Sequence, residues 1–282
     1  ACNFDSIYHQ KGIITAFKEA GYQTAFFSNQ RYNHSFIDFF GKEADTFDFI
    51  KEDSLDSAYN PSDDELLALV AKELSKGNQK QFIVLHTYGS HFNYRERYPS
   101  EDAFFLPDYP VEAEVKYRDN LVNAYDNTIR YTDGFLSRLI HMLEEQHVDA
   151  AMLYTSDHGE DIFDDSRHLF LHASPVPSYY QLHVPFLIWM SDTYREAYPE
   201  HWQTVTGNKD KDVSSSCSFF PTMLELGGVQ TSYRNDSSSV VSPLYTMKPR
   251  VYLNDHNEPR PLDDLGMKQP DFQKCQVLGI KY

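Results

Sequence analysis

An adjacent acid and imidazole stand at the end of an apolar run in the middle of the chain. Residues 150–156 have the length and composition of a buried strand, and Asp157, His158 and Gly159 complete its polar end. Ligands of open α/β sheets bind where strands end, and Gly159 would let the backbone turn both side chains toward one point. A carboxylate oxygen and an imidazole nitrogen suit zinc, which predicts Asp157 and His158 as metal ligands. An isolated pair of this kind would more often be a helix cap and a solvated histidine, so its context decides.

A second apolar run also ends in histidines. Residues 81–85 lead into His86, and His91 follows a glycine and a serine. Neutral imidazole binds metals, and protonated imidazole holds phosphate or gives a proton to a leaving oxygen. His91, beyond the glycine, is therefore the better catalytic and substrate-binding candidate, whereas His86 could equally be a buried, hydrogen-bonded side chain.

Three more histidines follow the Asp157-His158 pair. His172 is the candidate among them, because a short connection can return it to the same strand end. We expect it to reach the same strand-end cleft as Asp157 and His158. For His168 and His183 a surface position is the default.

Strand-like and helix-like segments alternate along the chain, which favours βα units, an α/β fold and a mainly parallel sheet. The expected strands span residues 22–28, 81–87, 150–156 and 184–190, and the expected helices span residues 12–20, 63–76, 116–145 and 214–226. The longest helix should cover one face of the sheet.

The C-terminal part carries less pattern. Residues 233–242 are polar and serine-rich, which predicts a surface loop, and residues 251–253 suit an edge strand. Neither a repeat nor a convincing linker occurs. We therefore expect residues 1–282 to form one catalytic domain with a smaller subregion at 230–282.

Composition excludes several functions. The chain has 282 residues and a formal charge of −17, and such a surface repels nucleic acid. No run of about 18–20 apolar residues suggests a membrane helix. Three widely spaced cysteines allow at most one disulfide and form no CxxC metal pair.

Taken together, these segments resemble a known family. Residues 155–160, Thr-Ser-Asp-His-Gly-Glu, are similar to the metal-binding signature shared by sulfatases and phosphoethanolamine transferases. Residues 86–99 resemble the transferases' histidine segment, which ends in Gly-Ser-His before Arg-Tyr-Pro, and residues 171–175 resemble their histidine loop. Residues 26–30 and 123–133 are similar to an early strand and the long helix. The resemblance is to transferases that modify lipid A or lipopolysaccharide.

This resemblance implies an alkaline-phosphatase-like three-layer αβα sandwich around a mainly parallel sheet. It also implies zinc at Asp157 and His158, with His91 and His172 at the substrate headgroup or a second zinc, and Asn29 as a further substrate contact. The donor would be a phospholipid, phosphatidylethanolamine, and the acceptor a glycolipid such as lipid A. The domain would lie in the periplasm of an inner-membrane protein.

One departure concerns the nucleophile. The family's catalytic threonine and a glutamate ligand precede the segment that matches residues 22–29, and nothing before Tyr22 resembles them. Thr15 and Thr24 lie inside element patterns. We therefore expect the nucleophile, one metal ligand and the membrane-associated region to lie upstream of this chain, and the fragment alone to be inactive.

Three alternatives stay open. A sulfatase would use a modified residue in a Cys/Ser-x-Pro-x-Arg motif, which does not occur in this chain. A glycerophosphate transferase of the lipoteichoic acid synthase kind would differ in its donor. A non-enzymatic binding domain would make the histidines at the strand ends a coincidence.

Overall fold

The computed structural model describes residues 12–31, 36–51, 60–77, 80–172, 176–253 and 258–280. These residues fall into two compact units. The first comprises the described parts of Ala1–Glu112, Asp119–Gln146 and Val229–Ser232, and the second those of Ala113–Arg118, His147–Gly228 and Tyr233–Tyr282. Residues after 232 thus belong to the same unit as residues 147–228. Among the described helices, none combines the length and the apolar character needed to cross a bilayer.

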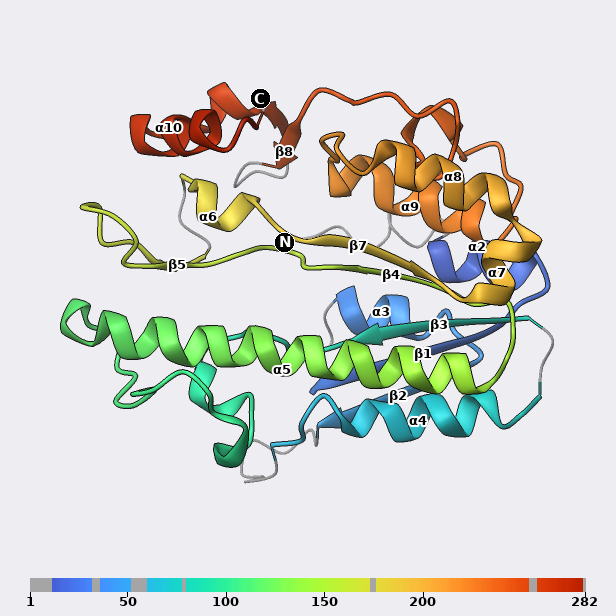
Figure 1. The fold of residues 1–282 in the computed structure, drawn as a ribbon, viewed down its shortest axis with the longest axis horizontal. Helices are drawn as coiled ribbons and strands as arrows, with labels where there is room; N and C mark the ends of the chain where they lie inside the picture. The colour runs from blue at the N-terminus through green and yellow to red at the C-terminus, as the bar shows by residue number, and fades with distance from the viewer. Residues whose placement is uncertain are drawn as a thin grey trace. The chain divides into compact units, whose positions relative to one another are not determined.

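The first unit is built on a parallel sheet with the strand order β2-β1-β3 (Figure 1). β1 pairs with β2 from Ala25 opposite Thr46 and with β3 from Gln23 opposite Gln81. The predicted strands at 22–28 and 81–87 and the predicted helices at 12–20, 63–76 and 116–145 are confirmed with small shifts of their ends. The elements are β1 (Gln23–Arg31), β2 (Thr46–Lys51), β3 (Gln81–His86), α2 (Ile13–Glu19), α3 (Phe36–Gly41), α4 (Glu65–Leu74) and α5 (Arg118–Glu145).

Apolar side chains from two helices cover this sheet. Phe17 of α2 stacks on Phe82 of β3 with ring centroids 3.8 Å apart, and Leu66 and Val70 of α4 are buried. β1 is buried from Thr24 to Asn29, as expected for the central strand of a covered parallel sheet.

The segment after β3 is fastened to α5 by one buried amide. Asn127 Oδ1 accepts hydrogen bonds from the backbone N–H groups of Phe104 and Phe105, each at 2.9 Å. Its Nδ2 donates to the Phe105 carbonyl at 3.0 Å. These contacts give a loop of exposed apolar side chains a fixed backbone.

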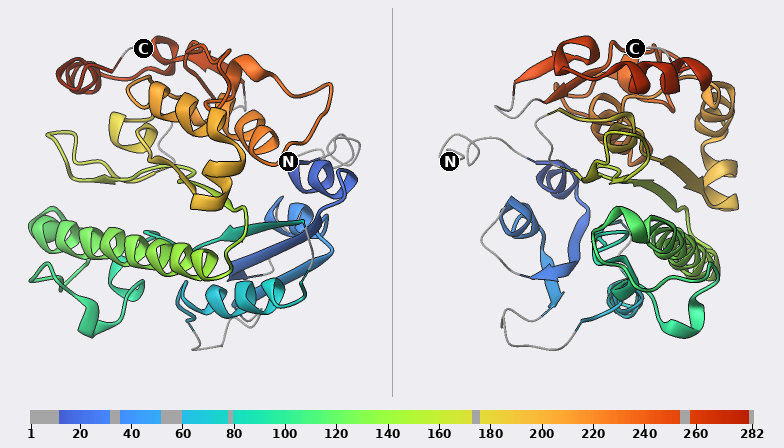
Figure 2. Two further views of the ribbon diagram at one scale, coloured as in Figure 1. Left: turned by 45° about the vertical axis from the view of Figure 1, so that its right-hand side comes forward. Right: turned by 90° about the vertical axis from the view of Figure 1, so that its left-hand side faces the viewer.

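The second unit contains an antiparallel strand pair. β4 (Ala151–Thr155) lies beside β7 (Phe186–Met190), with Ala151 opposite Met190 and Thr155 opposite Phe186 (Figures 1 and 2). The predicted strands at 150–156 and 184–190 are confirmed. The expected parallel pairing is found in the first unit, whereas these two strands pair antiparallel. The connection carries a hairpin and a one-turn helix instead of a crossover helix, so β7 returns antiparallel. These elements are β5 (Asp161–Ile162), β6 (Phe170–Leu171) and α6 (Tyr179–Leu182).

The remaining elements complete the second unit. The helix predicted at 214–226 and the strand predicted at 251–253 are confirmed. The elements are α7 (Asp192–Ala197), α8 (Pro199–Asn208), α9 (Ser215–Leu226), β8 (Val251–Leu253), β9 (Pro259–Pro261) and α10 (Gln269–Val277).

The prediction that residues 233–242 form a surface loop is wrong for the second half of this segment. Val240 and Val241 are 3% and 0% exposed and join a core cluster with Met190 and Tyr194. The Val240 N–H donates to the buried Thr222 hydroxyl at 3.1 Å. Because the backbone finds polar partners inside, burial of the two valines outweighs the polar composition around them.

Candidate metal centre

A short hairpin brings Glu160 and His172 together. In the hairpin Asp161 pairs with Leu171 and Ile162 with Phe170, so the same antiparallel register sets Glu160 opposite His172. Their side chains meet, with Glu160 Oε1 3.2 Å from His172 Nδ1. The sequence pattern singled out His172 but not Glu160, because a ladder of two residues per strand is too short to show a hydrophobic alternation.

His158 completes a group of three potential metal ligands. One ligand atom each from His158, Glu160 and His172 lies within 4.8 Å of the others, and the two imidazole rings are 3.7 Å apart. His158 Nδ1 lies 2.9 Å from the Gly159 carbonyl, which can only accept, so Nδ1 carries the hydrogen and Nε2 offers a lone pair. Two imidazoles and a carboxylate that is 4% exposed form a donor set that fits zinc.

Asp157 lies at the edge of this group. Its side chain is 85% exposed, and its Oδ2 is 3.7 Å from His158 Nε2. Neighbouring ligand atoms in a tetrahedral zinc site are roughly 3.4 Å apart, given the usual bond lengths. The geometry is therefore compatible with joint ligation by Asp157 and His158, which stays a prediction. The helix-cap alternative is wrong, because β5 follows instead of a helix.

Gly159 is required by a close backbone approach. A Cβ added there would lie 2.1 Å from the Tyr180 carbonyl oxygen, and the Gly159 N–H donates to the Gln181 carbonyl at 2.8 Å. We expected Gly159 to permit an unusual backbone turn, whereas the structure assigns it a steric role against α6.

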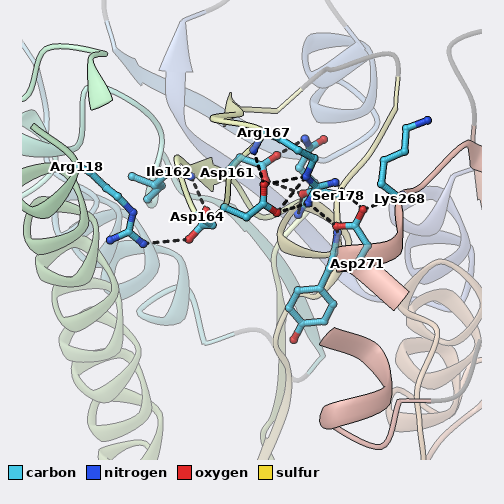
Figure 3. A network of polar contacts seen from close by, with 11 residues as sticks. Arg118, Asp161, Ile162, Asp164, Arg167, Ser178, Lys268 and Asp271 are labelled. Carbon is cyan, nitrogen blue, oxygen red and sulfur yellow. Dashed lines mark hydrogen bonds and ion pairs between the residues drawn. The ribbon is translucent and has the colours of Figure 1, made fainter. Parts of the chain in front are cut away.

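A buried carboxylate ties the base of the hairpin to α6. Asp161, next to Glu160, accepts from Ser178 Oγ at 2.8 Å and from Gln181 Nε2 at 2.6 Å (Figure 3). Burial raises the pKa of Asp161, although both hydrogen bonds act in the opposite direction. Ser178 and Gln181, which follow His172 in the sequence, are therefore held beside β5.

The tip of the hairpin is held by Arg167 and Asp271 (Figure 3). Arg167 Nη1 and Nη2 donate to the two carboxylate oxygens of Asp271 at 2.7 and 2.8 Å. Burial by itself would raise the pKa of Asp271, but hydrogen bonds from Arg167 and from the backbone N–H groups of Tyr179 and Lys268 outweigh it and hold that pKa below its usual value. Asp271 is thus an ionised, fully paired buried acid.

Three hairpin residues have a left-handed backbone. Phe163, His168 and Leu171 have φ angles of 55°, 51° and 65°, a conformation that costs non-glycine residues about 1–2 kcal/mol each. Leu171 directly precedes His172. Such a backbone persists only where surrounding contacts fix it, and strained residues of this kind cluster at functional sites.

The histidine that ends β3, His86, and the one that follows it, His91, belong to the first unit. His91 is exposed, and its ring makes an edge contact with Tyr88. His86 Nδ1 lies 2.8 Å from the Ser28 hydroxyl, in agreement with the hydrogen-bonded alternative for this residue. The catalytic and substrate-binding roles of His91 stay predictions.

Asn29 also lies in the first unit, where it is 1% exposed. Its Nδ2 donates to Asp63 Oδ1 at 2.8 Å and to the Pro61 carbonyl at 3.0 Å. Its Oδ1 is buried and has no hydrogen-bond partner among the described residues. The predicted substrate contact of Asn29 stays a prediction. Residues 173–175 of the predicted histidine loop lie outside the described residues.

An α/β fold with candidate histidine and carboxylate metal ligands beyond a strand end is typical of the alkaline phosphatase and sulfatase class. Residues 4–229 match the sulfatase family, and the chain belongs to this family.

Its relatives include transferases. The phosphoethanolamine transferase EptA of Salmonella typhimurium is 34% identical over 168 residues, which are 57% of this chain and 30% of that protein. The chain therefore spans about a third of the length of this curated relative. The resemblance to phosphoethanolamine transferases that the sequence motifs indicated is confirmed.

Solved structures show the same fold. The C-terminal periplasmic domain of EptC from Escherichia coli, in complex with Zn, superposes with a TM-score of 0.81 at 23% identity over 93% of this chain and 74% of that chain. The soluble domain of lipooligosaccharide phosphoethanolamine transferase A from Neisseria meningitidis gives a TM-score of 0.71 at 26% identity, over 82% and 70%. The predicted alkaline-phosphatase-like α/β fold is confirmed.

Proposed function

We propose that this chain is part of a metal-dependent enzyme that transfers phosphoethanolamine from phosphatidylethanolamine to lipid A or a related glycolipid in the periplasm. The observation that carries the proposal is the group of His158, Glu160 and His172 beyond the end of β4, in a domain of the sulfatase family whose relatives bear the transferase name. The sulfatase and glycerophosphate transferase alternatives are not favoured, because the similar proteins of higher identity are phosphoethanolamine transferases.

The metal would be zinc. His158 would contribute Nε2, Glu160 and His172 would add the other two donors of the group, and Asp157 is near enough to join them. Bound zinc would supply Lewis-acid stabilisation of negative charge on the phosphoryl oxygens.

The remaining roles would fall to His91, Asn29 and a threonine. A histidine that binds metal through one ring nitrogen is a poor proton donor, so His91 is the better candidate to protonate the leaving alcohol. Asn29 would contact the phosphoethanolamine group. The nucleophile would be a threonine, which would carry the group between donor and acceptor.

The test is phosphoethanolamine addition in cells. The complete gene that contains this chain is expressed in Escherichia coli lacking its own lipid A phosphoethanolamine transferases, and lipid A is analysed by mass spectrometry. We expect lipid A to gain one phosphoethanolamine group with the wild-type protein and to remain unmodified with His158→Ala or Asp157→Asn. Unmodified lipid A with a wild-type protein that is present at normal levels would refute the proposal.

His168→Asn is the matched control. His168 is exposed on the same hairpin, and its φ of 51° is one that asparagine tolerates. This variant should modify lipid A like the wild type. A loss equal to that of His158→Ala would mean that the assay reports damage to the hairpin and not loss of a ligand.

A further inference from the structure

One carboxylate outside the metal-ligand group contacts the chain on both sides of His172. Asp271 lies in α10, beyond residue 229, where the match to the sulfatase family ends. Its side chain is 0% exposed. The carboxylate of Asp271 binds the guanidinium of Arg167, which precedes His172 in the sequence. It also accepts a hydrogen bond from the backbone N–H of Tyr179, which follows His172, at 2.9 Å. The residue thus brackets the segment that carries a candidate ligand.

Arg167 uses its planar fork at this point. Its Nε and Nη2 donate to Asp165 in the hairpin loop at 2.9 and 2.6 Å, while Nη1 and Nη2 reach Asp271 (Figure 3). A guanidinium can serve two carboxylates in this way, whereas an ammonium has no such fixed geometry. Arg167 therefore links the hairpin tip rigidly to α10.

The hairpin needs such a link. Two residues in each strand do not make a ladder that is stable by itself, and Phe163, His168 and Leu171 have positive φ angles. Contacts from outside the hairpin therefore hold this backbone, at its base through Asp161 and at its tip through Arg167.

We propose that Asp271 is a positioning residue for the metal centre, which through Arg167 and Tyr179 holds His172 opposite Glu160 and beside His158. The inference rests on the proposed function, because it takes His172 as a metal ligand. The inference adds that α10 helps to position the metal centre, although this helix carries none of the three candidate ligands.

The experiment compares zinc affinity and folding in the complete protein that contains this chain. Zinc dissociation constants are measured by competition with a chromophoric chelator for the wild type, Asp271→Asn and Asp263→Asn, well below the melting temperature of each. Asp263 is an exposed acid in the same C-terminal segment. Residues that orient metal ligands typically change metal affinity about 10–100-fold, so we expect Asp271→Asn to bind zinc at least about tenfold more weakly and Asp263→Asn to match the wild type.

The readout separates positioning from folding. If Asp271 only docks α10, Asp271→Asn melts earlier but binds zinc as tightly as the wild type, and this result would overturn the proposal. Should Asp271→Asn fail to fold, Arg167→Lys takes its place, since lysine keeps the positive charge and loses the fork. Arg167→Lys should also weaken zinc binding, and unchanged affinity in a folded Arg167→Lys variant refutes the inference.

A metal-free measurement distinguishes this inference from the proposed function. If the complete wild-type protein binds no zinc, the proposed metal centre is refuted. The anchor is then judged by hydrogen exchange at the Phe163 amide, which donates to the Leu169 carbonyl within the hairpin. Faster exchange in Asp271→Asn than in Asp263→Asn supports the anchor, and equal exchange overturns it.

Discussion

Replacing Gly159 by alanine adds one methyl group where no space exists. The new Cβ would lie 2.1 Å from the Tyr180 carbonyl oxygen, so the loop and α6 must separate by more than an ångström to reach van der Waals contact. Backbone lies on both sides, and a rotamer change cannot relieve the clash. The hydrogen bond from the Gly159 N–H to the Gln181 carbonyl, 2.8 Å long, would stretch or break.

The expected destabilisation follows from these two effects. Overpacking a closed interior costs about 1–3 kcal/mol, and a weakened hydrogen bond adds roughly 0.5–1.5 kcal/mol. Gly159→Ala should therefore lose about 2–4 kcal/mol. In a unit of this size about 1 kcal/mol lowers the melting temperature by roughly 2–4 °C, so a calorimetric scan should show a drop of about 4–16 °C.

Gly207→Ala is the matched control for this measurement. Gly207 lies in α8, and a Cβ there would meet nothing within 4 Å. Alanine in a helix is favoured over glycine by about 1 kcal/mol, so this variant should melt at or slightly above the wild-type temperature. If Gly159→Ala melts with the wild type, the contact between this loop and α6 is not as close as described.

Two further predictions concern stability. Asn127→Ala should lower the free energy of unfolding by about 2–3 kcal/mol, because the N–H groups of Phe104 and Phe105 lose their acceptor. The control Asn123→Ala loses one exposed hydrogen bond and should lower it by under about 1 kcal/mol. Equal losses in thermal unfolding of the two variants would contradict this prediction. Burial lowers the pKa of His201 below its ordinary 6.5. The unfolded chain therefore protonates this imidazole more readily than the folded chain does, and the stability of the fold decreases as the pH drops below about 6.5. His201→Gln should lose less melting temperature than the wild type between about pH 7.5 and about pH 5.5, and a parallel decline of both proteins would refute the assignment.

The sequence predicts a helix or a strand well where its hydrophobic pattern extends over many residues. The 28-residue α5 and the buried strand β1 are strongly patterned, and each was placed within a few residues. β2 (Thr46–Lys51) was missed, although it pairs with β1, because its side chains are half-buried or exposed and show no clear alternation. Residues 240–241 were misplaced for the opposite reason, since two valines inside a serine-rich segment carry too little pattern to predict burial.

The strength of the local pattern also explains what could be predicted of the candidate metal centre. Asp157 and His158 lie just beyond the end of β4, so local pattern and the rule that ligands bind at strand ends were enough to select them as candidate ligands. Glu160 gains its place only through the hairpin register. Asp271 acts across 104 residues of sequence and stands on a helix with no chemical motif. Local sequence therefore identifies residues that can bind a metal, whereas the contacts that orient them depend on tertiary pairing, which makes variants of Asp271 and Gly159 the more demanding test of the structure.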